Sequence, residues 1–230
     1  LAMGSQNNIL ANQHFSSKIG GSNINFGYSF QKTDGYNATT KTSKNPAEKD
    51  GFQKQNLSLV VRHKNSLLGD LLLSSRVHLI KNDLDKGFGS ERDDSNYSTK
   101  DKFYFHSLKI KPKFKNNYIN PEFYLGISKA DRKTDDLSDS LSSFNDSQAY
   151  LSEILQVKVH NVFYLSDQDI VISGIDYLNE SGSFNLELSG SDTVFAKKGE
   201  SHLGIYAHYQ KDLSPFILNL GVRTENHKSN

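Results

Sequence analysis

Alternation of apolar and polar residues is the strongest pattern in the chain, and it is clearest over residues 22–34. Ile24, Phe26, Tyr28 and Phe30 fall on one side of an extended chain, whereas the intervening Asn, Gly, Ser and Gln residues fall on the other. No i, i+3, i+4 stripe occurs here, so the pattern predicts a strand rather than a helix. The apolar face of such a strand either packs in the core of a soluble sandwich or faces lipid in a transmembrane barrel.

Similar alternation recurs along the chain and predicts about ten or eleven strands. They are expected within residues 1–3, 9–19, 22–34, 52–63, 71–83, 102–114, 118–132, 150–165, 169–178, 202–209 and 216–223. No internal repeat longer than the hairpin is evident. The pattern predicts an all-β fold formed by one domain over residues 1–230.

Connections between these strands alternate in length. Short turns are expected near residues 20–21, 64–70, 115–117, 166–168 and 212–214, and long polar intervals over residues 35–50, 85–101, 133–147 and 179–199. Outer-membrane barrels have short periplasmic turns and long outer loops, whereas a soluble sandwich has no reason to sort its loops in this way. The loop pattern therefore favours the wall of an antiparallel up-and-down transmembrane β-barrel.

Composition agrees with a sheet rich in strands. The 230 residues include 14 Phe, 11 Tyr and no Trp, with four Pro and one Met. The absence of Cys excludes disulfide bonds and thiolate metal sites. No run of about 18 apolar residues occurs, which excludes a transmembrane helix but leaves a barrel open. A net charge of +1 argues for neither a nucleic-acid partner nor binding to an acidic membrane surface, and no nucleic-acid partner is expected.

Candidate chemistry on the polar face is sparse. No Cys-x-x-Cys, His-Glu-x-x-His, Gly-x-Ser-x-Gly or phosphate-loop motif occurs among the 230 residues. Of the eight histidines, His202 and His208 fall on one face of one strand, but they lie about 20 Å apart at roughly 3.3 Å per residue, too far to share an ion. Polar filler facing the lumen is the favoured interpretation. Charged residues expected to point inward are Arg62, Arg76, Lys109, Lys111, Glu122 and Lys158.

Short segments throughout the chain resemble one family of membrane proteins. They are Gly4-Ser5, Thr33-Asp34-Gly35-Tyr36-Asn37, Lys49-Asp50-Gly51-Phe52, Gly174-Ile175-Asp176-Tyr177 and Leu220-Gly221-Val222-Arg223. In this order they resemble TonB-dependent outer-membrane receptors, and within that group the cobalamin (vitamin B12) receptor type. The resemblance implies that the chain is about half the wall of a barrel of about 22 strands, without the plug domain of the family. It further implies the outer membrane of a Gram-negative bacterium, and a TonB complex that acts through the plug.

The resemblance also implies a calcium site in the early outer loops. Residues that correspond by position to the calcium ligands of the family are Asn37, Glu48, Asp50, Asp85, Asp93 and Asp94. Asn37 and Glu48 stand where aspartates are usual in the family. Calcium binding by loops requires several converging hard oxygen ligands. Solvated acidic loops that bind no ion are the alternative.

Four other functions remain open for this sequence. A ferric-siderophore receptor of the same superfamily is the nearest alternative to a cobalamin receptor. A self-contained porin-like barrel of ten to twelve strands and a soluble all-β surface domain are further alternatives. An outer-membrane enzyme also stays open, because catalytic residues spread over several strands leave no spacing motif. Transport without covalent chemistry is the favoured prediction.

Overall fold

The computed structural model describes residues 1–35, 50–65, 69–84, 97–114, 118–137, 146–188 and 191–229, with the backbone alone for residues 191–195. These residues form one sheet with the strands β1 (Ala2–Met3), β2 (Ile9–Ile19), β3 (Ser22–Thr33), β4 (Phe52–Asn65), β5 (Gly69–Asp83), β6 (Tyr97–Lys111), β7 (Ile119–Asp136), β8 (Asp146–Tyr164), β9 (Asp169–Leu188), β10 (Ser191–Asp212) and β11 (Ile217–Ser229). Nowhere in the described ranges is there a helix long and apolar enough to cross a membrane.

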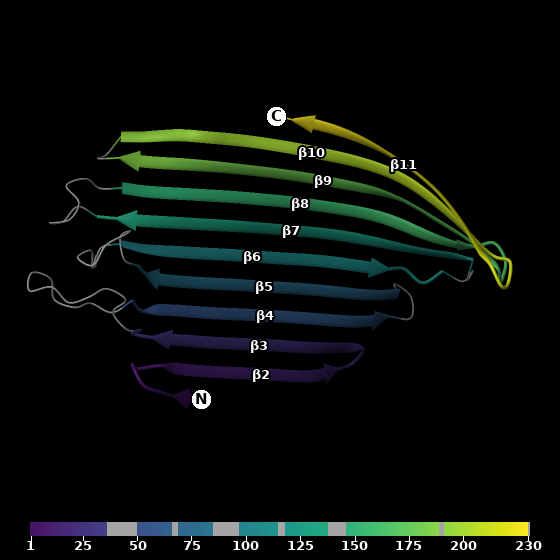
Figure 1. The fold of residues 1–230 in the computed structure, drawn as a ribbon. Coiled ribbons are helices and arrows are strands. Elements are labelled where there is room, and N and C mark those ends of the chain that lie inside the picture. The colour runs from purple at the N-terminus through teal and green to yellow at the C-terminus, as the bar shows by residue number, and fades with distance from the viewer. Residues whose placement is uncertain are drawn as a thin grey trace, which may run out of the picture.

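Every strand pairs antiparallel with its neighbour in the sequence, so the spatial order of the eleven strands is their chain order. Figure 1 shows them side by side in a single curved layer, from the short β1 beside β2 at one edge to β11 at the other. This up-and-down meander confirms the predicted all-β class and antiparallel topology.

The register places the apolar residues of successive strands in continuous rows on one face. One such row crosses nine strands, from β2 to β10. It starts at Ser17 and continues through Ile24, Val61, Leu73, Leu108, Leu125, Val157, Tyr177 and Leu203. Because side chains directly opposite each other in an antiparallel pair share a face, a single side of the sheet becomes mostly apolar. Polar exceptions on that side include Ser75, His106, Asn161 and Ser173. We call it the apolar face, and the other the polar face.

No hydrophobic side chain is buried in the described part of the chain, so this sheet has no core of its own. Residues in the middle of the apolar face remain well exposed, for example Ile127 at 48% and Ile205 at 50%. Soluble proteins rarely expose an apolar patch of more than a few hundred Å². A face that spans so many strands is therefore suited to lipid rather than to water.

The apolar face has a sharp limit toward the end of the sheet that carries the longer connections. The first polar residue beyond the apolar rows on each strand, from β3 to β11, is Lys32, Gln55, Lys81, Lys102, Lys129, Glu153, Asn179, Ser201 and Thr224. Beyond this limit both faces carry mostly polar residues. The limit marks one border of an apolar band across the sheet.

Several strands are longer than the sequence pattern predicted. The predicted long connection over residues 179–199 was wrong, because β9 continues to Leu188 and β10 begins at Ser191. Similarly, β6 begins at Tyr97 instead of residue 102, and β7 ends at Asp136 instead of residue 132. The physical reason is that these extensions lie beyond the apolar band, where both faces are polar and the alternation disappears while the hydrogen-bond ladder continues.

Connections are sorted between the two ends of the sheet, as the sequence indicated for all but one of the long intervals. The breaks at residues 20–21, 66–68, 112–118, 165–168 and 213–216 lie at one end. The strand ends that flank the breaks at residues 34–51, 84–96, 137–145 and 189–190 lie at the other end, on the left of Figure 1. The last of these four is short, because β9 and β10 form a long hairpin. The short connection between β1 and β2, at residues 4–8, also lies at this end.

Candidate functional site

The polar face carries the charged residues that the sequence predicted to point inward. The register places Arg62, Arg76, Lys109, Glu122 and Lys158 on the face opposite the apolar rows, and Lys111 lies beside Glu122. The structure thus confirms that they share one face, opposite the apolar rows. The polar face is therefore the candidate functional surface of the chain.

Glu122 of β7 is the centre of the charge cluster near the short turns. Its two carboxylate oxygens pair with Lys109 and Lys111 of β6, and the Lys111 Nζ to Glu122 Oε2 distance is 2.9 Å. The side chain of Glu122 is 18% exposed. One carboxylate thus balances two ammonium groups, and the cluster keeps a net positive charge.

Side chains from the neighbouring strands β7 and β8 and from β10 line a hollow on this face. Its volume is about 300 Å³, and it is lined by Glu122, Tyr124, Gln156, Lys158, His160 and Tyr206. A hollow of about 290 Å³ lies nearby and includes Arg62, Lys109 and Lys111 in its lining. Both hollows combine cationic and hydrogen-bonding groups, which suits contact with an anionic or strongly polar group.

Glycines provide the room in which two long side chains lie across neighbouring strands. A Cβ added at Gly174 of β9 would lie 2.5 Å from the hydroxyl oxygen of Tyr206. A Cβ added at Gly204 of β10 would lie 2.9 Å from Nη2 of Arg223. Small residues at these two positions therefore let Tyr206 reach the hollow and let Arg223 reach β9.

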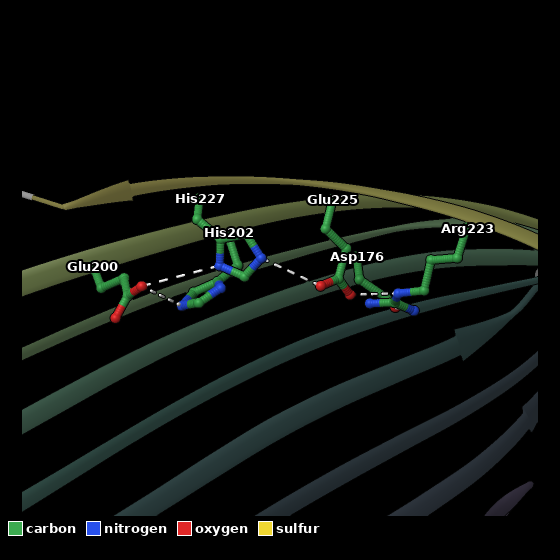
Figure 2. Close-up of polar contacts among 6 residues, drawn as sticks. All are labelled: Asp176, Glu200, His202, Arg223, Glu225 and His227. Carbon is green, nitrogen blue, oxygen red and sulfur yellow. Dashed lines mark hydrogen bonds and ion pairs between the residues drawn. The ribbon is translucent and has the colours of Figure 1, made fainter.

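Arg223 of the last strand connects three strands on the polar face. Its Nη1 lies 3.2 Å from Oδ2 of Asp176 on β9, and its Nε donates to Glu225 on its own strand. The guanidinium carbon also lies 5.8 Å from the ring centroid of Tyr206. Figure 2 shows Arg223 with Asp176 and Glu225, beside a second group formed by Glu200, His202 and His227.

A third cluster lies beyond the apolar band, toward the end with the longer connections. There Arg132 pairs with the buried Asp101, and Asp135 pairs with Lys133 at 2.9 Å. Burial alone would raise the pKa of Asp135, but hydrogen bonds from Lys133 and Ser147 outweigh it and hold the pKa below the ordinary aspartate value. This part of the sheet is held together by charge pairs rather than by apolar packing.

The predicted calcium ligands fall mostly outside the described residues. Asn37, Glu48, Asp85, Asp93 and Asp94 all lie there, and the calcium site stays a prediction. Asp50 is described and lies at the base of the first long connection, where a Cβ added at Gly35 would lie 1.9 Å from the Asp50 carbonyl oxygen.

Sequence reasoning missed the grouping of Glu200, His202 and His227. His202 was compared with His208 on its own strand, whereas its nearest imidazole belongs to β11, directly opposite. Counting outward from the predicted turn at residues 212–214 would have placed Thr224 opposite His202, and only the actual turn at residues 213–216 brings His227 there.

Comparisons with known proteins bear on the fold. No protein-family model matches the chain, and no curated protein matches its sequence. Among solved structures, the crystal structure of the ferric citrate transporter FecA in the unliganded form is similar, with a TM-score of 0.71 and 12% identity. The match covers 98% of this chain and 36% of the transporter chain.

The chain shares the fold of part of this transporter. It spans little more than a third of the transporter that it matches. At 12% identity the likeness concerns the fold alone. The likeness therefore does not identify a ligand.

Proposed function

We propose that this chain is part of the wall of an outer-membrane, TonB-dependent receptor that takes up a large nutrient chelate. The observation that carries the proposal is the apolar band on one face of a single curved sheet without a core, together with a charged, hollowed opposite face. In such a barrel the band contacts lipid and the polar face lines the interior. The similarity to a transporter of known structure supports the same architecture.

Cobalamin is the first candidate ligand, on the strength of the sequence segments that resemble the cobalamin receptor type. A ferric chelate is the second candidate. It is favoured by the similarity to a ferric citrate transporter and by the surplus of cationic groups around Glu122, since ferric citrate is an anionic complex. Transport in either case proceeds without covalent chemistry on the ligand.

Binding to the complete receptor in outer-membrane vesicles tests this function. Saturable binding of radiolabelled cyanocobalamin supports the first candidate, and saturable binding of ferric citrate or a ferric siderophore without cyanocobalamin binding supports the second. Uptake should in both cases disappear in cells that lack TonB. Failure to bind any of these chelates, combined with passive conductance for small solutes, would instead identify a porin-like barrel.

We further propose that calcium orders the outer loops through Asp50 and the other predicted ligands. Hard oxygen donors converging from loops are the ligands that Ca²⁺ prefers. The proposal predicts that Asp50→Ala reduces ligand affinity in 1 mM Ca²⁺ and leaves the affinity in EDTA unchanged. Asp167→Ala is the control, because this acidic residue lies in the turn at residues 165–168, at the opposite end of the sheet. Equal ligand affinity with and without calcium would exclude the site.

A further inference from the structure

The geometry points to a binding site for a divalent transition-metal ion, with Zn²⁺ as the reference, formed by Glu200, His202 and His227 on the polar face. The ligand atoms of these three side chains all lie within 4.8 Å of one another, and the trio is the single such group in the described part of the chain. This inference does not depend on the proposed transport function, because it rests on the β10–β11 hairpin alone.

The hairpin register brings the two imidazoles together. His202 of β10 and His227 of β11 are directly opposite each other, and their ring centroids lie 4.3 Å apart at an interplanar angle of 82°. Glu200 lies two residues before His202 and therefore projects from the same face. Three donors thus come from two paired strands, which hold their backbones at a fixed separation (Figure 2).

Distances within the trio are close to those that a tetrahedral ion requires. Oε1 of Glu200 lies 3.5 Å from Nε2 of His202 and 4.0 Å from Nδ1 of His227. Bonds of about 2.0–2.1 Å to tetrahedral zinc place neighbouring ligand atoms about 3.4 Å apart. The three side chains are 28 to 51% exposed. Small rotamer changes of these exposed side chains can therefore bring the ligand atoms to the separation that zinc requires.

Glu225 favours the form of His227 that binds a metal through the inner nitrogen. Nε2 of His227 lies 3.3 Å from Oε2 of Glu225. A carboxylate at this position accepts the Nε2–H hydrogen bond, so the lone pair of Nδ1 faces Glu200. Metal-binding histidines commonly donate their second ring N–H to a carboxylate in this way. Arg223 in turn holds Glu225 in place.

The neighbouring strand adds a second reason for a cation at this position. The register places Glu180 of β9 directly opposite Glu200, on the same face. Like charges directly opposite each other in an antiparallel pair destabilise the pairing. A bound divalent cation would offset this repulsion. Imidazole nitrogen ligands favour Zn²⁺, Cu²⁺ or Ni²⁺ over Ca²⁺ and Mg²⁺, which prefer oxygen.

Metal titration of the full chain in detergent tests the site. After chelator treatment, equilibrium dialysis with element analysis should find one Zn²⁺ bound per chain through this site, and His202→Gln or His227→Gln should each lower the affinity by on the order of 10- to 100-fold. His208→Gln is the matched control and should bind zinc as the wild type does, because His208 lies on the same face of the same strand outside the trio. Glu225→Gln should have a smaller effect than either ligand variant.

A spectroscopic measurement keeps the test independent of small changes in folding. With Cu²⁺ as the probe, electron paramagnetic resonance of the wild type should show coupling to imidazole nitrogens that weakens in His202→Gln and in His227→Gln. Wild-type affinity in both ligand variants, an equal loss in His208→Gln, or displacement of Zn²⁺ by equimolar Ca²⁺ would each overturn the proposal. The cluster would then be a set of histidine–carboxylate ion pairs.

Discussion

Arg132 of β7 holds the carboxylate of Asp101, its direct cross-strand partner on β6, with two parallel hydrogen bonds. The Nε–Oδ1 distance is 2.7 Å and the Nη2–Oδ2 distance is 3.0 Å. Asp101 is only 6% exposed. A paired arginine fork satisfies both oxygens of a carboxylate that has little access to water.

Removal of this arginine should destabilise the sheet measurably. Arg132→Ala leaves the carboxylate of Asp101 without its two charge-assisted hydrogen bonds, and we expect a loss of about 1–3 kcal/mol in the free energy of unfolding. Guanidinium-induced unfolding of the protein in phospholipid vesicles measures this loss. Arg132→Lys should recover part of the loss, because the ammonium keeps the charge but not the fork.

Lys129→Ala is the matched control for Arg132→Ala. Lys129 also pairs with its direct cross-strand partner, Glu153, at 2.8 Å, but both of these side chains are well exposed. Exposed pairs of this kind contribute about 0–1 kcal/mol. A loss in Lys129→Ala as large as that in Arg132→Ala would contradict the argument from burial.

Two adjacent residues of β8 test which face contacts lipid. Val157 lies on the apolar face and Gln156 lines the hollow on the polar face. Val157→Arg should destabilise the protein by about 2–4 kcal/mol in vesicles, since a cation on the lipid side near the middle of the bilayer is unfavourable. Gln156→Arg should be tolerated. Equal tolerance of both substitutions would show that the apolar face does not contact lipid.

Two glycines with positive φ allow the cost of a left-handed backbone to be measured separately from the cost of steric crowding. Gly20 (φ 57°) has no atom within 4 Å of an added Cβ, whereas a Cβ at Gly69 (φ 87°) would lie 2.0 Å from the carbonyl oxygen of Lys111. Gly20→Ala should cost about 1 kcal/mol for the left-handed conformation alone. Gly69→Ala should cost about 3 kcal/mol or more, because the turn backbone must move.

Both glycine variants can be compared with the wild type by the amount of folded, heat-modifiable protein in the outer membrane. We expect Gly69→Ala to reduce it strongly and Gly20→Ala to reduce it little. Similar yields of folded protein would contradict the crowding at Gly69.

Asp169 at the short-turn end should make stability sensitive to acid. A hydrogen bond from Tyr209 at 2.6 Å, followed by one from Ser166, holds the pKa of Asp169 below its ordinary value. A lowered pKa means that this carboxylate stabilises the folded state fully above the ordinary aspartate pKa. The contribution is lost as the pH falls through the lower, folded-state pKa.

Tyr209→Phe removes the largest cause of this shift. Denaturant midpoints measured from pH 6 to pH 3 should therefore fall less steeply in Tyr209→Phe than in the wild type. Tyr164→Phe, at the same end of the neighbouring β8, should follow the wild-type profile. Parallel profiles for the wild type and Tyr209→Phe would show that Asp169 does not contribute.

Most of the fold could be predicted from local pattern. The alternation at Ile24, Phe26, Tyr28 and Phe30 assigned these residues to one face, and the register confirms that assignment. The same reasoning failed beyond the limit of the apolar band, where both faces are mostly polar. Asn179, Ser181 and Ser183 carry no alternation, yet they continue β9 because the ladder with β10 and β8 satisfies their backbone groups.

The candidate sites depend on which strands face each other. Inward charges such as Lys109 and Glu122 could be predicted individually, since facing direction follows from position along a strand. Their pairing could not, because a shift of one residue in register would turn every partner to the other face. The same holds for His202, Glu200 and His227, which lie on two strands.

The sequence by itself determined the class of structure and the two faces of the sheet, because strand geometry turns a period of two into opposite sides without any reference to distant residues. Only the tertiary structure decided how far each strand extends and which charged groups and imidazoles meet. Those outcomes depend on the hydrogen-bonded register between strands, to which residues far apart in the sequence contribute together.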